Sequence, residues 1–254
     1  MTKKFTHKTA IVTGAGQGIG FEIARHLALR GASVLLNDID EKLAKNASLK
    51  IIAEGGNCCA LAGDAADVAF IQKMVQTAVQ QFGKVDIAVA NAGITLFGEF
   101  LTYPAESLQS VMRLNLQGSF FLVQAAANQM IKQQSGGSIL LMSSVTGHQA
   151  HQNLVAYGMT KAALEMLAKG LVVELSPYKI TVNSIAPGAT LTERTLEDSD
   201  YKNTWSRITP MGRPATVDDV ANAALFLVSP DSGHITGQNI IVDGGWTAVS
   251  TSPY

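Results

Sequence analysis

The sequence predicts an α/β fold in which a doubly wound parallel sheet of about seven strands carries helices on both faces. Short apolar runs alternate with longer amphipathic runs along the chain, and glycine stands at several joints between them. The 254 residues, 47% of them hydrophobic and 15% charged, suffice for a large core and suit one domain. We therefore expect a single domain over residues 1–254.

The first half of the chain supplies four strands with a helix after each of the first three. We expect strands in residues 9–14, 33–38, 58–64 and 85–93, and helices in residues 20–31, 41–55 and 68–83. Gly31, Gly55 and Gly83 end these helices, where a left-handed cap favours glycine. This order is typical of βαβ units, which build a parallel sheet.

The second half continues the alternation with longer helices. A long apolar helix is expected over residues 105–133, then a strand over 136–144, a helix over about 157–175, and strands over 179–188 and 238–245. Residues 190–219 are polar with weak periodicity, so we interpret them as a lid or substrate loop within the domain.

Composition and charge limit the kinds of molecule that the protein is expected to bind. The formal net charge of −1 and the lack of long like-charge runs argue against nucleic acid or an anionic membrane as partner. No signal-peptide core and no 18-residue apolar run stand in the sequence, so we expect a soluble, cytoplasmic protein. Cys58 and Cys59 are adjacent and lack metal-ligand spacing, which favours reduced packing residues and no metal site.

The stretch TGAGQGIG, residues 13–20, follows the first strand and opens the first helix. Gly14, Gly18 and Gly20 permit a tight turn and let a diphosphate approach backbone N–H groups at the positive end of a helix. Any glycine-rich turn could carry this spacing by chance. The strand before it and the helix after it favour dinucleotide binding.

An acidic residue closes the next strand. Asp38 stands 18 positions beyond Gly20, where a carboxylate accepts hydrogen bonds from an adenosine ribose and repels a 2′-phosphate. NAD is therefore favoured over NADP, although Lys42 lies close by. The alternative is an ordinary turn or helix-cap aspartate. Gly63–Asp64 and Asn91–Gly93 end the third and fourth strands at the same edge of the sheet, where each alone also fits a plain turn.

The stretch AYGMTKAAL places Tyr157 and Lys161 four positions apart on one expected helix face. Moving a hydride between a carbinol carbon and a nicotinamide also requires a proton to move on the oxygen. Phenol is a poor base at neutral pH, and an adjacent ammonium favours the phenolate. Ser144, thirteen residues earlier at the end of a strand, places a hydroxyl at the same edge, where it would hold the substrate oxygen.

Taken together, these motifs resemble the classical short-chain dehydrogenases/reductases over nearly the whole chain. The resemblance rests on TGAGQGIG, Asp38, Gly63–Asp64, Asn91–Gly93, RLNLQGSF, Ser144, Tyr157 with Lys161, NSIAPG and ITGQNIIVDGG. It implies a Rossmann-type sheet of strand order 3-2-1-4-5-6-7, an NAD-dependent activity on CH–OH groups, and frequent homotetramers.

The resemblance also implies roles for individual residues. Tyr157 is the general acid and base, Ser144 orients the substrate, Lys161 favours the phenolate and binds the nicotinamide ribose, and Asn115 holds a water behind that lysine. The implied cofactor-binding residues, besides Tyr157 and Lys161, are Gly14, Gln17, Gly18, Ile19, Gly20, Asp38, Asp64, Ala65, Asn91, Ala92, Gly93, Pro187, Gly188, Thr190 and Thr192. By family position, Thr146 and Leu154 line the substrate pocket with Ser144 and Tyr157.

Polar residues around the expected site favour a sugar or polyol as the secondary alcohol. His148, His151, Gln152 and Asn153 lie between the serine and the tyrosine, and the lid contains Glu193, Arg194, Asp198, Tyr201 and Trp205. Each alone also fits a solvated loop. Two alternatives remain: an NADP(H)-dependent 3-oxoacyl-carrier reductase, and a catalytically inactive nucleotide-binding sensor.

The two longest expected helices are apolar over more than the one stripe that covers a sheet. A second apolar face predicts subunit contacts, and the alternative is coverage by the chain's own loops. The residues concerned are Leu108, Val111, Met112, Leu114, Phe120, Phe121 and Val123 in the first helix, and Met159, Ala162, Ala163, Leu164, Met166, Leu167, Leu171 and Val172 in the second.

Overall fold

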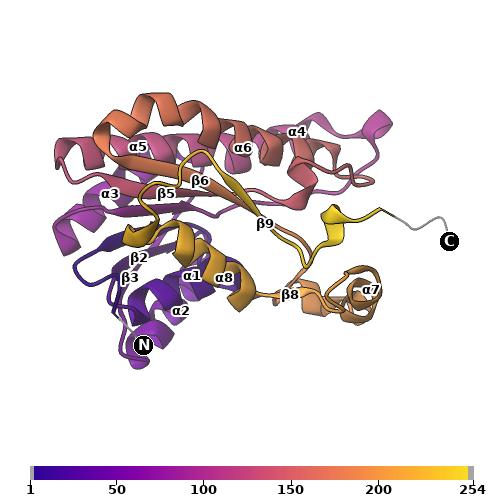
Figure 1. Ribbon diagram of the computed structural model, residues 1–254, viewed down its shortest axis with the longest axis horizontal. Helices are drawn as coiled ribbons and strands as arrows, with labels where there is room; N and C mark the ends of the chain where they lie inside the picture. Colours follow the sequence, from indigo (N-terminus) through magenta and orange to yellow (C-terminus); the bar gives the residue numbers. More distant parts are fainter. Residues whose placement is uncertain (1–2, 251–254) are drawn as a thin grey trace.

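The computed structural model describes residues 3–250 (Figure 1). A seven-stranded parallel sheet in the order β3-β2-β1-β4-β5-β6-β9 forms its centre. This confirms the predicted topology, β9 being the seventh strand of the sheet. The strands are β1 (Thr9–Val12), β2 (Ser33–Asp38), β3 (Asn57–Ala62), β4 (Ile87–Ala90), β5 (Gly137–Met142), β6 (Ile180–Pro187) and β9 (Asn239–Val242), and β7 (Thr190–Leu191) pairs with β8 (Ala215–Thr216) in a separate small sheet.

Helices cover both faces of the sheet. In Figure 1, α1, α2 and α8 lie below the sheet and α3, α5 and α6 lie above it. Two apolar clusters fill the layers, because side chains alternate along each buried strand: Ala10 and Val12 join the first cluster and Ile11 joins the second. The helices are α1 (Gly18–Leu29), α2 (Glu41–Ala53), α3 (Val68–Phe82), α4 (Ala105–Val111), α5 (Ser119–Lys132), α6 (Val155–Leu175), α7 (Tyr201–Ile208) and α8 (Val217–Leu227).

Local sequence signals set several helix ends. Asp40 caps α2 by accepting hydrogen bonds from the backbone N–H groups of Lys42 and Leu43. Thr216 and Asp219 form a reciprocal capping box at the start of α8. As predicted, Gly31, Gly55 and Gly83 adopt left-handed backbone at φ of 101°, 88° and 87°.

The predicted helix over residues 105–133 proves to be three consecutive pieces. Between α4 and α5 the backbone forms a π-helical stretch, Met112–Gly118. A π stretch has a wider turn than an α-helix and re-aims the side chains it carries. Here it turns Asn115 fully inward, to 0% exposure. The apolar pattern alone predicts only that a helix is present.

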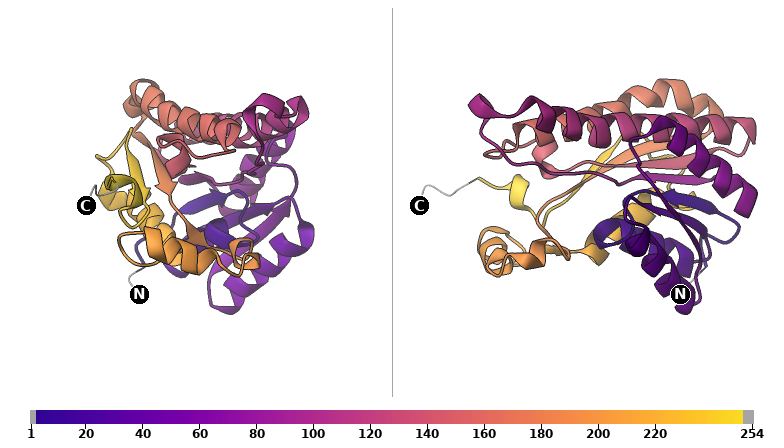
Figure 2. Two further views of the ribbon diagram at one scale, coloured as in Figure 1. Left: turned by 90° about the vertical axis from the view of Figure 1, so that its right-hand side faces the viewer. Right: turned by 180° about the vertical axis from the view of Figure 1, so that it is seen from behind.

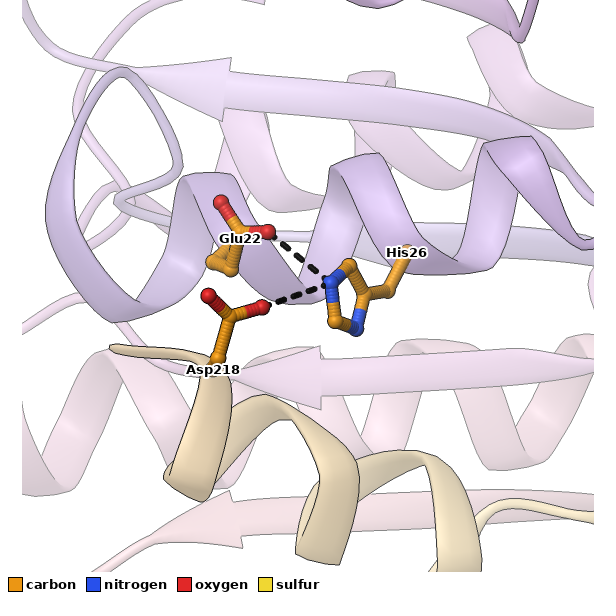
Figure 3. A group of neighbouring side chains, drawn as sticks. All are labelled: Glu22, His26 and Asp218. Atoms are coloured by element: carbon orange, nitrogen blue, oxygen red, sulfur yellow. Dashed lines mark ion pairs between the residues drawn. The ribbon is translucent and has the colours of Figure 1, made fainter. Parts of the chain in front are cut away.

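An ion-pair cluster of residues far apart in the sequence joins α1 to α8. His26 Nε2 lies 2.9 Å from Glu22 Oε1 and 2.9 Å from Asp218 Oδ1 (Figure 3). Glu22 and His26 stand one turn apart on α1, and Asp218 stands in the first turn of α8. This cluster therefore connects the helix that follows the glycine turn to the helix that follows residues 190–216.

The segment between β6 and α8 carries the small sheet and α7. Figures 1 and 2 place α7 apart from the layer of α1, α2 and α8, near the C-terminal segment. Trp205 on α7 packs edge to face on Trp246, with ring centroids 5.1 Å apart. This contact joins the expected lid to the segment that follows β9.

The two cysteines form no disulfide: Cys58 is buried and Cys59 is half-buried. Burial raises the pKa of the Cys58 thiol to about 12, so it stays protonated at neutral pH. Within residues 3–250, no helix combines the length and the apolar character that crossing a membrane requires.

Candidate active site

A cleft of about 250 Å³ opens where the glycine turn, the end of β4, the start of α6 and the lid segment meet. It brings together eleven of the residues singled out in the sequence: Gln17, Gly18, Ile19, Gly20, Asn91, Gly93, Tyr157, Lys161, Thr192, Glu193 and Arg194. Thr95 and Met142 complete its lining. Thr95 and Met142 carry no motif of their own, so the sequence offers no signal for them.

Tyr157 and Lys161 are adjacent in the cleft, as their spacing predicts. Lys161 Nζ lies 5.3 Å from the centroid of the Tyr157 ring. The Lys161 residue is only 3% exposed, and its ammonium donates a 2.7 Å hydrogen bond to the Met142 carbonyl. No acidic side chain in the described part of the chain forms an ion pair with it. A buried, unneutralised ammonium stabilises negative charge beside it, which is the condition that a phenolate needs.

Ser144 stands just beyond β5 and begins a short 3₁₀ turn, Val145–Gly147. Its Oγ accepts a hydrogen bond from Thr146 N at 3.3 Å. Ser144 is not among the residues that line the cleft. Thr146 Oγ1 is buried with no hydrogen-bond partner in residues 3–250. Leu154, at 7% exposure, immediately precedes α6.

Asn115 joins the helical layer to the segment that follows β4. Its Nδ2 donates to Ile94 O at 2.9 Å, and its Oδ1 accepts from Ile94 N at 2.8 Å. Nδ2 also lies 3.3 Å from Thr160 Oγ1, the residue before Lys161. The amide thus fixes residue 94 in a reciprocal pair and contacts the helix that carries Tyr157.

The glycine turn has the shape of a cradle. Gly14 has a φ of 59°, and a Cβ there would lie 2.8 Å from Ala92 Cα, so only glycine fits without strain. A Cβ at Gly20 would collide with Asn91 Nδ2 and Gly14 O. Asn91 Nδ2 donates to the carbonyls of Thr13 and Gly14, each at 2.9 Å. Asn91 therefore braces the turn from β4 in addition to lining the cleft.

The N-terminus of α1 fits an anionic group. No side chain caps it, and its first turn carries no acidic residue, so the backbone N–H groups of Gly18, Ile19 and Gly20 have no acceptor within residues 3–250. The Glu193 carboxylate lies 3.7 Å from the point that a Cβ at Gly18 would occupy. A dinucleotide diphosphate fits this terminus, and Glu193 stands at its entrance.

Asp38 lies beside the glycine turn. Its Oδ2 accepts from Gly16 N at 2.9 Å and its Oδ1 accepts from Asp40 N at 3.1 Å. The helix cap of α2 is Asp40 and not Asp38, which removes the helix-cap interpretation of Asp38. Lys42 is exposed.

Asp64 and Ala65 follow β3. Asp64 Oδ2 pairs with Arg113 of the π-helical stretch at 2.5 Å, and its Oδ1 accepts from Ala66 N at 2.8 Å. Sequence reasoning missed the Arg113 partner, because 49 residues separate the two.

Beyond β6, the chain turns sharply through the remaining predicted cofactor residues. Gly188 packs against Asp243, since a Cβ there would lie 2.7 Å from Asp243 Cβ. Thr190 Oγ1 donates to Gly188 O at 3.1 Å, and Thr192 N donates to Thr195 Oγ1 at 2.8 Å. Pro187 ends β6 and Ala92 follows β4, whereas Thr192 reaches the cleft.

A family model described as enoyl-(acyl carrier protein) reductase matches residues 14–247. The chain is 38% identical over 242 residues to L-rhamnose 1-dehydrogenase (NAD(P)(+)) of Sphingomonas sp. (strain SKA58), covering 94% of this chain and 95% of that protein.

Two solved structures share the fold. A short-chain type dehydrogenase/reductase from Mycobacterium marinum superposes with a TM-score of 0.92 at 33% identity, covering 97% of this chain and 98% of that chain. A gluconate 5-dehydrogenase from Burkholderia cenocepacia J2315, solved in complex with NADP and tartrate, superposes with a TM-score of 0.90 at 32% identity, covering 98% of both chains.

Proposed function

Because the chain belongs to the short-chain dehydrogenase/reductase family, we propose that it transfers a hydride between NAD(H) and the carbinol carbon of a secondary alcohol. The observation that carries this proposal is the pairing of Tyr157 with the buried Lys161 in a cleft shared with the glycine turn. When bound, the nicotinamide supplies the hydride acceptor or donor.

Residues of the chain accept and return the proton that moves with the hydride. Tyr157 takes the hydroxyl proton when the alcohol is oxidised and returns it when the carbonyl is reduced. The Lys161 ammonium stabilises the phenolate, and Ser144 Oγ donates a hydrogen bond to the substrate oxygen. Asn115 supports this arrangement by fixing residue 94 against the helix that bears Tyr157.

The cofactor that we propose is NAD. Its diphosphate would bind the uncapped start of α1, and its adenosine ribose would bind Asp38. The Asp38 carboxylate supports NAD over NADP, because it would repel a 2′-phosphate. Similar proteins are named for NAD(P)(+) or solved with NADP, so turnover with each of the two cofactors tests this preference directly.

A sugar, polyol or sugar acid is the substrate class that we propose. Two of the similar proteins are named as a rhamnose and a gluconate dehydrogenase. The polar lid residues Glu193 and Arg194 supply hydrogen-bonding groups at the cleft. The rival is a carrier-bound acyl substrate, which the description of the matching family model raises.

We further propose that the enzyme is a homotetramer in which α5 and α6 pack against a second copy of the chain. An apolar groove of about 830 Å³ runs between these helices and is lined by Phe120, Met166 and Leu171 among others. Leu108 of α4 and Met159 of α6 are also exposed, whereas Val111 of α4 and Leu164 of α6 are buried in the chain's own core. Light scattering should report a tetramer for the wild type and a smaller species for Met166→Asp.

The function is tested with the purified protein, NAD or NADP, and a panel of sugars, polyols, hydroxy acids, ketones and a 3-oxoacyl thioester, followed by NAD(P)H absorbance. We expect NAD-dependent oxidation of a sugar or polyol. Tyr157→Phe should retain cofactor binding and lose turnover by orders of magnitude, whereas Tyr178→Phe should match the wild type. Turnover of the thioester alone, with NADPH, would establish the reductase instead. Unchanged turnover in Tyr157→Phe would remove its proposed role.

A further inference from the structure

We propose that Glu165 is a positioning residue that holds the Ser144 segment in register with Tyr157 and Lys161, an inference that rests on the proposed function. Glu165 lies on α6, one turn beyond Lys161 and two turns beyond Tyr157. Its side chain is mostly buried, at 14% exposure, and no step of the proposed reaction uses it.

The carboxylate of Glu165 contacts the chain on both sides of Ser144. Ser143 Oγ lies 2.8 Å from Glu165 Oε1 and 3.0 Å from the Lys161 carbonyl, so its hydroxyl hydrogen is shared between two acceptors on α6. His148 Nδ1 lies 3.4 Å from the same Glu165 oxygen. Residues 143 and 148 are thereby fixed to the helix that presents Tyr157.

Residues 143–148 approach α6 so closely at Gly147 that no residue larger than glycine fits there without displacing its neighbours. A Cβ at Gly147 would lie 2.8 Å from Glu165 Oε1 and 3.0 Å from both Ala162 N and Lys161 C. The last two atoms are backbone and cannot rotate away. Contact at Gly147 and hydrogen bonds at Ser143 and His148 therefore define one position for the turn that begins at Ser144.

Burying a carboxylate is unfavourable unless its hydrogen bonds compensate. Among the described residues, Glu165 forms no ion pair with lysine or arginine, and His148 is its one basic partner. The network nevertheless ties together the two segments that must align a serine and a tyrosine on one substrate oxygen. Because a displacement of about 1 Å can cost roughly 100-fold in rate, this alignment is where Glu165 acts.

The inference predicts a specific pattern for Glu165→Ala and Glu165→Gln. Glu165→Ala should lower kcat by roughly tenfold or more, with the Kd for NADH unchanged within about twofold, because the glycine turn is untouched. Glu165→Gln keeps an oxygen that accepts from Ser143 and should recover most of kcat. Gly147→Ala should reproduce the kcat loss from the opposite side of the contact. Glu41→Ala, at the exposed first position of α2, is the matched control.

Hydrogen–deuterium exchange supplies a readout that needs no substrate. The amides of Gly147, His148 and Gln149 donate to carbonyls of Ser144 and Val145 within the segment. They should exchange faster in Glu165→Ala and stay slow in Glu165→Gln and Glu41→Ala. Circular dichroism verifies that each variant is folded.

The outcomes separate this inference from the proposed function. If the amides of residues 147–149 exchange in Glu165→Ala as slowly as in the wild type, Glu165 does not hold this segment, whatever the protein catalyses. Faster exchange with unchanged kcat overturns the positioning role and leaves the proposed function standing. Turnover that survives Tyr157→Phe overturns the proposed function, while the exchange data still decide whether Glu165 holds the segment.

Discussion

Replacing Lys161 by Met tests the electrostatic basis of the proposed chemistry. Methionine keeps the length and apolar character of the side-chain stem and removes the charge. The ammonium lies 5.3 Å from the centroid of the Tyr157 ring, over which a phenolate spreads part of its charge. With an effective dielectric constant of about 20, Coulomb's law gives about 3 kcal/mol of stabilisation at this distance. A loss of that size corresponds to roughly 200-fold in kcat.

The assay measures kcat at saturating substrate together with the Kd for NADH from fluorescence, so that weakened cofactor binding is separated from slower proton transfer. Lys169→Met is the control, because Lys169 is an exposed lysine two turns further along the same helix. A Lys161→Met enzyme within about threefold of the wild-type kcat would refute the electrostatic argument. The ammonium would then not stabilise the phenolate enough to affect the rate.

Three further predictions concern cofactor choice, stability and thiol reactivity. Asp38→Ser should raise the ratio of kcat/KM for NADP to that for NAD by roughly tenfold or more, because it removes a charge that repels the 2′-phosphate; an unchanged ratio would contradict this. Asp219→Asn should lower the free energy of unfolding at pH 7 by about 1 kcal/mol in urea titrations. Arg213 holds the pKa of the Asp219 carboxyl well below its usual range, so this stabilisation is present above about pH 4 and should shrink as the pH falls further. The prediction is wrong if the difference in unfolding free energy between the wild type and Asp219→Asn grows as the pH falls toward 3. Cys58 should react with a thiol reagent at pH 8 only at the rate of local opening, because burial raises its pKa to about 12; fast labelling of folded protein would argue against that burial.

Much of the framework could be predicted from local sequence patterns. Alternating apolar runs depend on periods of 2 and 3.6 residues, which are properties of neighbouring residues, and they predicted the central sheet. The spacing of Tyr157 and Lys161 likewise requires only that both stand on one helix, and the two side chains are adjacent in the structure. Glycines at helix ends follow from the backbone conformations that other residues avoid.

Interactions between distant segments could not be predicted in this way. The burial of Asn115 depends on a π-helical stretch whose apolar pattern matches an α-helix. The pairing of Arg113 with Asp64 joins segments that only the packed sheet brings together.

The sequence by itself predicted the seven strands of the central sheet, the helices up to residue 175, their order, and which residue types stand at the carboxyl edge of the sheet, because each depends on local backbone preference and hydrophobic periodicity. It predicted neither α8 nor the elements α7, β7 and β8 within the expected lid. Only the tertiary structure decided that Glu165 holds the segment around Ser144 and that His26 joins α1 to α8. Such contacts arise when separate elements pack, and a side chain then meets partners that no local pattern encodes.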